Sequence, residues 1–386
     1  MSQQPEPEDG RAADAFRAAL CRRADEVAPD VALPTRPARR SGRWVAAGAA
    51  LAVAASAVVG FALVNRDRAA DGALDPAGDP PAIAEGWRGV SFRDVVVQVP
   101  EEWGDASAPG PDWCADVPRD RIDGPYVDLR GSGGFFLTVG CAQQSPVPAG
   151  FGPDPQEQWV PHLRLVDLTS ADVKDVPDGT TTFGDWTLRA RTIGEVQVRL
   201  LSDASTEDVA DDIVASAQTS DTGALGCDTT SPAQEQPRED RPVAPAEGDL
   251  AAVDPDEVQG LLVCQYDRVG ADQPGLRAER LAGAAAARAW LGAVQDAPRT
   301  GGPDQPQNCM EPWDSTMTLA VHPLGVDGSR LATGFVAYDA CAGNGVRDAT
   351  TTWQLTRETC AALFGARVRF WSGNGEAGAR CAPSYE

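Results

Sequence analysis

The sequence predicts an α+β protein: two disulfide-stabilised extracytoplasmic modules, each a mainly antiparallel sheet with packed helices, behind one transmembrane helix. Three observations predict this class. One long uncharged apolar run lies near the N-terminus, an even number of cysteines follows it, and two regions of short apolar strands flank a proline-rich stretch. The length of 386 residues fits two domains with additional segments, and 42% hydrophobic residues suffice for packed cores.

The apolar run covers residues 44–64 and contains no charged side chain. As a helix it would extend roughly 30 Å, which matches the hydrocarbon core of a bilayer. Four arginines lie between residues 36 and 43, whereas the two arginines after the run are offset by acids. The positive-inside rule therefore predicts a cytoplasmic tail at 1–43 and a membrane-anchored outer region, which begins with a tether at 65–85. A signal peptide cleaved after 55–57 is the alternative.

The nine cysteines divide in agreement with this topology. Cys21 lies on the predicted inner side, where thiols stay reduced. The other eight lie outside, and we expect them to pair with their sequence neighbours, as Cys114–Cys141, Cys227–Cys264, Cys309–Cys341 and Cys360–Cys381. No two cysteines have C-x-x-C spacing, and the two histidines lack partners at metal-ligand spacing, so we expect no metal site.

The first outer module is predicted at residues 86–222. Alternating apolar residues predict strands, and a capping sequence at Ser205 opens a helix. The expected strands are 90–92, 95–99, 126–129 and 135–139, followed by a hairpin of 181–191 with 195–201.

A linker is predicted at residues 223–257, because 229–248 is rich in proline and polar residues. The second outer module, 258–386, is expected to contain a strand at 261–266 and a helix at 278–295 whose Leu281 and Leu291 face a sheet. The remaining expected elements are a hairpin of 316–322 with 331–338, a strand at 353–355, a helix at 356–363 and a strand at 368–371.

The cytoplasmic tail contains one amphipathic helix, predicted at residues 14–28. Phe16, Leu20 and Val27 lie near one face of it. A helix of this length is marginal in water by itself. It either docks on a cytoplasmic protein partner through these three residues or only spaces the anchor.

Composition and motifs argue against several function classes. A formal net charge of −24 disfavours nucleic acid as a partner. The sequence contains no G-x-S-x-G and no Walker pattern, and we expect no catalytic set and no cofactor. His162 and His322 stand beside prolines at expected strand ends, which favours structural roles. Exposed tryptophans would suit stacking on cell-wall sugars, although core packing is their commoner use.

Two sequence patterns resemble known proteins. Trp113-Cys114, the run 262–266 and the Gly-Pro-Asp-Gln-Pro of 302–306 with Cys309 resemble secreted or anchored proteins of actinobacteria. The tail helix, proline-rich segment and arginines are similar to the inner tails of transmembrane anti-sigma-type regulators. This resemblance implies a sigma factor as the cytoplasmic partner. The tail departs from the zinc-type regulators, which carry H-x-x-x-C-x-x-C there.

We therefore expect a non-enzymatic, single-pass envelope protein whose outer modules bind or sense a ligand that the sequence does not identify. The bilayer would contact residues 44–64. One alternative is an anti-sigma-like transmembrane regulator that contacts its partner through Phe16, Leu20 and Val27. The other alternative is an anchored hydrolase of cell-wall polymers, which would require a pair of carboxylates.

Overall fold

The computed structural model describes residues 81–106, 122–129, 148–151, 156, 159–169, 173, 176–232, 248–267, 275–304, 318–338, 342–365, 367–370 and 375–382. All of them lie in one compact unit, 68–386. None of the helices formed by these residues is long and apolar enough to cross a bilayer. The predicted span at 44–64 and the predicted tail helix at 14–28 lie outside the described residues. What is described is a mixed α+β fold, rich in sheet.

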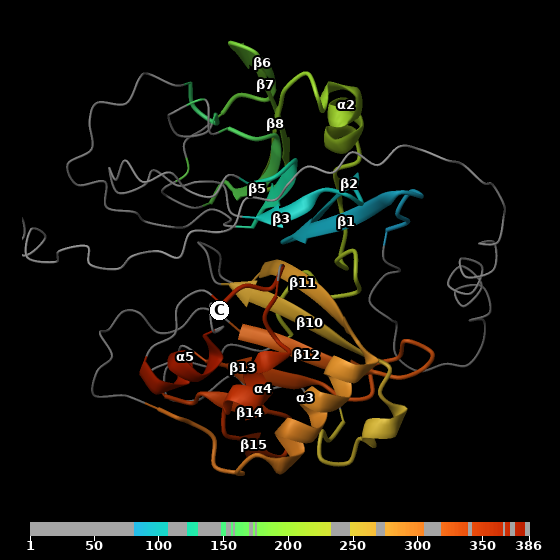
Figure 1. Ribbon diagram of the computed structural model, residues 1–386, viewed down its shortest axis with the longest axis vertical. Coiled ribbons are helices and arrows are strands. Elements are labelled where there is room, and N and C mark those ends of the chain that lie inside the picture. Colours follow the sequence, from blue (N-terminus) through green and yellow to red (C-terminus); the bar gives the residue numbers. More distant parts are fainter. Residues whose placement is uncertain are drawn as a thin grey trace, which may run out of the picture. The chain divides into compact units, whose positions relative to one another are not determined.

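A six-stranded mixed sheet forms the centre of the first module (Figure 1), in the order β3-β4-β5-β8-β7-β6. The pairs β3–β4 and β4–β5 are parallel, and the others are antiparallel. The bounds are β3 Gly104–Ala106, β4 Tyr126–Asp128, β5 His162–Asp167, β6 Gly179–Phe183, β7 Trp186–Ile193 and β8 Val196–Ser202. The predicted strand at 135–139 lies outside the described residues.

A smaller sheet and one helix complete this module. The sheet has the order β1-β2-β9, with β1 Trp87–Phe92, β2 Val95–Pro100 and β9 Gln218–Thr219. Helix α2, Glu207–Ala215, packs its Ile213 against the alternating valines of β2 and β8. The β1–β2 hairpin and α2 confirm the strands and the helix that the sequence predicts here. Both elements arise from local periodicity of apolar residues.

The prediction of a single strand over 181–191 is wrong. The chain turns at Gly184 and Asp185, so that Phe183 pairs with Trp186 and the region forms β6 and β7. Gly184 has φ +61°, a value that glycine adopts without steric cost and that the first central position of a type II′ hairpin turn requires.

The second module contains a six-stranded antiparallel sheet in the order β11-β10-β12-β13-β14-β15. Its helices pack on one sheet face, where Trp290 and Leu291 bury against Leu261 and Val263. The strands are β10 Gly260–Asp267, β11 Gly275–Gly283, β12 Thr318–Leu324, β13 Gly334–Ala337, β14 Gly345–Arg347 and β15 Thr352–Trp353. The helices are α3 Ala284–Asp296, α4 Arg357–Ala361 and α5 Gly375–Cys381, with a 3₁₀ turn, η2, at Pro255–Glu257.

The predicted helix at 278–295 is correct only in its second part. Residues 278–283 belong to β11 and pair along β10, with Leu281 opposite Leu262. Leu281 does not face the helix-covered side of the sheet as predicted, and 51% of its surface is exposed. Tertiary pairing overrides the helical preference of an alanine-rich segment here. No strand forms at 368–370, and the sequence did not predict β14 or α5.

Two parts of the predicted linker at 223–257 are packed segments in the structure. Residues 223–232 and 248–257 are described and pack against the second module, where Leu250 is fully buried in the core. The polar composition of the region hid this packing from the sequence analysis, because only a few apolar side chains in each segment contact the module. Only 233–247 of the predicted linker lies outside the described residues.

Candidate functional site

A loop at residues 220–230, here called the junction loop, connects the two modules. It follows β9 and then joins the edge of the second sheet, where Leu276 N–H donates to the Thr229 carbonyl (2.9 Å). Its middle covers the sheet face opposite α3, with Cys227 packed on Leu262. The loop therefore belongs to both modules.

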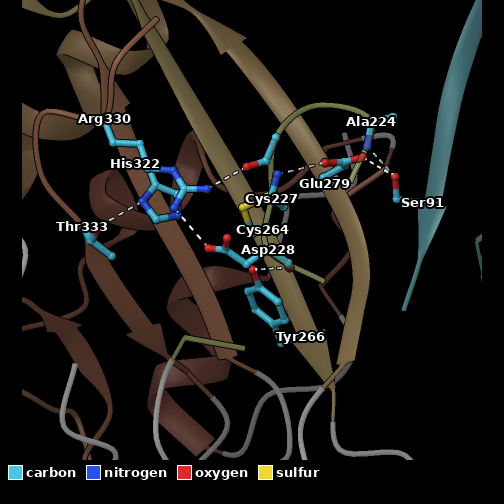
Figure 2. The surroundings of a disulfide bond; sticks show 11 residues. Ser91, Ala224, Cys227, Asp228, Cys264, Tyr266, Glu279, His322, Arg330 and Thr333 are labelled. Atoms are coloured by element: carbon cyan, nitrogen blue, oxygen red, sulfur yellow. Dashed lines mark hydrogen bonds and ion pairs between the residues drawn. A yellow bond between two sulfur atoms is a disulfide. The ribbon is translucent and has the colours of Figure 1, made fainter. Parts of the chain in front are cut away.

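A disulfide fixes the junction loop to the centre of the second sheet. Cys227 bonds Cys264 of β10, and both residues are fully buried (Figure 2). The second described disulfide joins Cys360 and Cys381, linking α4 to α5. Both pairings confirm the expected nearest-neighbour pattern. The other two expected pairs, Cys114–Cys141 and Cys309–Cys341, lie outside the described residues.

A buried carboxylate holds the same loop from the other side. Glu279 of β11 accepts a 2.5 Å hydrogen bond from Ser91 Oγ of β1, and the Cys227 N–H lies 3.4 Å from its other oxygen. Ser91 in turn accepts from the Ala224 N–H (2.8 Å). Glu279 is 4% exposed, and this burial raises the pKa of its carboxyl group, although the donors around it oppose the shift.

Close approach at this point requires glycine. A Cβ on Gly223 would lie 2.6 Å from a carboxylate oxygen of Glu279, which is too short for any contact. Figure 2 shows Glu279, Ser91 and Ala224 together on one side of the disulfide. The contact between modules is thus a specific, tightly packed one.

Further contacts join the two modules beside the loop. Arg93, at the β1–β2 turn with φ +52°, donates its backbone N–H to the carbonyl of Leu276. Asp105 of β3 accepts from Arg88 (2.8 Å) and from Arg367 of the second module (3.1 Å). A cavity of about 40 Å³ lies among these groups. It has room for a few water molecules, and the contacts around it join the two modules.

Both histidines are built into the sheets. His322 of β12 is 1% exposed, with Nδ1 3.0 Å from Thr333 Oγ1, and burial lowers its pKa to about 3. Arg330 lies beside it and bridges to Asp228 (3.1 Å) in the junction loop. His162 stacks on Tyr126 with ring centroids 5.2 Å apart. This burial agrees with the structural roles that the sequence predicts.

A larger cleft lies at one end of the first module. Its volume is about 390 Å³, within the range of small-ligand sites. Trp159, just before β5, and Trp186, which begins β7, line it with ring centroids 5.7 Å apart. Trp159 is almost fully buried, whereas Trp186 is half-buried and so presents part of its indole to the cleft.

The polar side chains of the cleft are acids and a hydroxyl. Asp123, Asp203 and Ser205 line it, and Ser205 Oγ donates to Asp203 (2.6 Å). No lysine or arginine is present among the described residues that line it. The cleft thus combines an aromatic wall with hydrogen-bond acceptors, a combination that suits a polyhydroxylated or otherwise uncharged ligand.

The sequence indicated only part of this arrangement. It singled out the tryptophans and the cysteines, but it gave no signal for Glu279, Ser91 or Arg330, whose roles depend on residues far away in the chain. Phe16, Leu20 and Val27, the predicted partner-binding residues, lie outside the described residues.

The chain was compared with protein-family models, with curated proteins and with solved structures, and none of these matches it.

Proposed function

We propose that this protein is a membrane-anchored extracytoplasmic binding protein, without catalysis, whose first module takes a small uncharged, hydroxyl-rich ligand such as a saccharide. This proposal rests on the cleft beside Trp186. Its size fits a small ligand, and its half-buried indole offers a surface for stacking against an apolar sugar face. Asp123 and Asp203 would accept hydrogen bonds from ligand hydroxyls.

Charge favours this ligand class over anions. Two carboxylates line the cleft, and the whole chain has a formal net charge of −24. Phosphorylated or nucleic-acid ligands would meet repulsion both at long range and at the cleft. A neutral saccharide avoids this cost.

The ligand can be tested by titrating the full chain, in detergent or nanodiscs, with soluble oligosaccharides from cell-wall glycans while tryptophan fluorescence is monitored. We expect saturable quenching, and Trp186→Ala should weaken the affinity at least about tenfold, the effect of losing roughly 1.4 kcal/mol of contact. Trp186→Phe retains an aromatic surface and should keep most of the affinity.

Two results would count against this proposal. Unchanged affinity in a folded Trp186→Ala protein would place the ligand elsewhere, and no quenching by any oligosaccharide would reject the ligand class. New reducing ends in the titrated sugar would favour the anchored hydrolase instead.

The extracytoplasmic location is supported by the compartments in which disulfides persist. Cys227–Cys264 and Cys360–Cys381 are both in the region that the sequence predicts to be outside. The uncharged run at 44–64, with arginines before it, supports an anchor whose N-terminal side is cytoplasmic.

Thiol labelling of intact cells tests this topology. Cys21 should resist a membrane-impermeant maleimide until the cells are lysed, because the bilayer separates it from the reagent. A Val326→Cys variant supplies the outer control, since Val326 is 88% exposed in the second module, and it should be labelled without lysis. Labelling of Cys21 on intact cells, or recovery of a chain cleaved after 55–57, would contradict the anchored topology.

A further inference from the structure

One edge of the described sheets differs from the others. Strands β3, β9 and β15 end their sheets with only two or three residues. The edge of β11 is covered, because the Leu276 carbonyl accepts from Arg93 and Thr230 forms a bridge with Gly275. β1 lies against the second module through Ser91. By contrast, β6 ends the first module's sheet with five residues, and Gly179–Thr182 are all exposed.

The sequence of β6 carries none of the usual protection of an edge strand. Natural proteins cover such edges or place charges, proline or bulges there, since a free edge pairs with other strands. β6 is Gly-Thr-Thr-Thr-Phe, without charge or proline, and it pairs with β7 in an unbroken register. Its three threonines are β-branched and favour strand structure. An edge of this kind is suited to pairing.

The register of β6 against β7 shows which backbone groups of β6 are available to pair with another strand. Phe183 and Trp186 close a two-residue turn, and such a closing pair is hydrogen-bonded. Because hydrogen-bonded and non-bonded pairs alternate along an antiparallel ladder, the backbone groups of Phe183, Thr181 and Gly179 face β7. The N–H and C=O groups of Thr180 and Thr182 therefore point away from the sheet.

We propose that β6 is the surface through which two copies of this chain associate, by antiparallel pairing of β6 with β6 about a two-fold axis at Thr181. In this register Thr180 lies opposite Thr182 of the second copy, and both residues have outward-facing backbone groups. Each of the two symmetric pairs exchanges two hydrogen bonds. Threonines opposite each other also form favourable cross-strand pairs. The arrangement is isologous, so it closes as a dimer.

The absence of charge on β6 and the small area of its edge favour pairing with a second copy that is held in the same membrane. The uncharged strand places no like charges opposite each other, although the whole chain is acidic. A five-residue edge buries far less than the roughly 1,200–2,000 Å² of stable interfaces, so pairing needs a high local concentration. The anchoring under Proposed function supplies this concentration, and in that respect the inference rests on it. The segment 65–80 can extend up to about 55 Å, so two anchored copies can reach each other.

Cysteine cross-linking in membranes tests this register. In a Cys21→Ser background, the full chain with Thr181→Cys should form a covalent dimer under mild oxidation, because residues facing each other at a non-bonded pair lie about 4.5 Å apart between Cα atoms. Thr180→Cys and Thr182→Cys should each cross-link weakly alone and strongly when the two variants are produced together. Dimer should fall at least about tenfold after dilution in detergent.

Several outcomes would overturn the proposal. Equal cross-linking at all three positions would mean random collision, and no dimer from a maleimide-accessible Thr181→Cys would mean a free edge. A Thr181→Cys thiol that is protected but forms no dimer would indicate that another peptide covers the strand. The thiol labelling of Cys21 decides the anchoring separately, so a failure of the anchor and a failure of the pairing are distinguishable.

Discussion

Replacing Cys227 and Cys264 together by alanine is expected to lower the free energy of unfolding by about 4 kcal/mol. The bond closes a loop with a sequence separation of 37 residues, and the chain-entropy model assigns this value to a loop of that length. The effect should exceed that of most single substitutions because the bond also fixes the junction loop between the modules. Urea denaturation of the oxidised proteins measures the change.

The second disulfide provides the matched control for this variant. Cys360→Ala with Cys381→Ala opens a shorter loop, with a sequence separation of 21, and should cost slightly less, about 3 kcal/mol. It should leave the contact between Ser91 and Glu279 intact, whereas the Cys227 variant should expose the junction loop to proteolysis. A cost below about 1 kcal/mol for the Cys227 variant would show that the loop is held mainly by Glu279 and its donors.

Glu279 is expected to make stability fall as the pH rises above the ordinary carboxyl range. Burial raises the pKa of Glu279 in the folded protein, so the folded state holds a proton that the unfolded state has released. Between the unfolded value of about 4.5 and the higher folded value, each pH unit then costs up to about 1.4 kcal/mol. Glu279→Gln should abolish this slope, which denaturation at successive pH values measures.

Two further variants separate charge from hydrogen bonding at this position. Glu279→Ala removes the acceptor of Ser91 and Cys227 and should cost about 2–3 kcal/mol at low pH, where the wild-type carboxyl group is protonated. This cost should shrink as the pH rises, because the variant lacks the titrating group. Asp178→Asn is a control for a group whose effect on the pH dependence of stability has the opposite sign. A backbone hydrogen bond from Thr192 lowers the pKa of Asp178. Asp178 stabilises the fold above its unfolded pKa, and that contribution is lost as pH falls. A wild-type slope identical to that of Glu279→Gln would mean that Glu279 does not titrate with folding.

Residues 275–283 are a case in which the local sequence pattern does not decide the secondary structure. Ala278 and its neighbours have helical composition and precede a genuine helix, α3, so the pattern continues without an obvious break. The strand forms because β10 supplies hydrogen-bonding partners along the whole of β11, with Leu281 opposite Leu262. Pairing partners of this kind are invisible to any window of sequence, since their energy comes from another segment.

Features that depend on near neighbours along the chain could be predicted from the sequence. The β1–β2 hairpin, the apolar stripe of α2 and the short helix α4 follow from periodicity and turn chemistry. The pairs Cys227–Cys264 and Cys360–Cys381 each join cysteines that follow one another in the sequence.

Features made by residues far apart in the chain could not be predicted, because they depend on how the chain folds. Ser91 and Glu279 are 188 residues apart, yet they form the buried contact between the modules. Trp159 and Trp186 meet because β5, β8 and β7 are neighbours in one sheet. The free edge of β6 exists only because the sheet ends there. In each case the energy comes from removing side chains from water against partners that the local sequence does not specify.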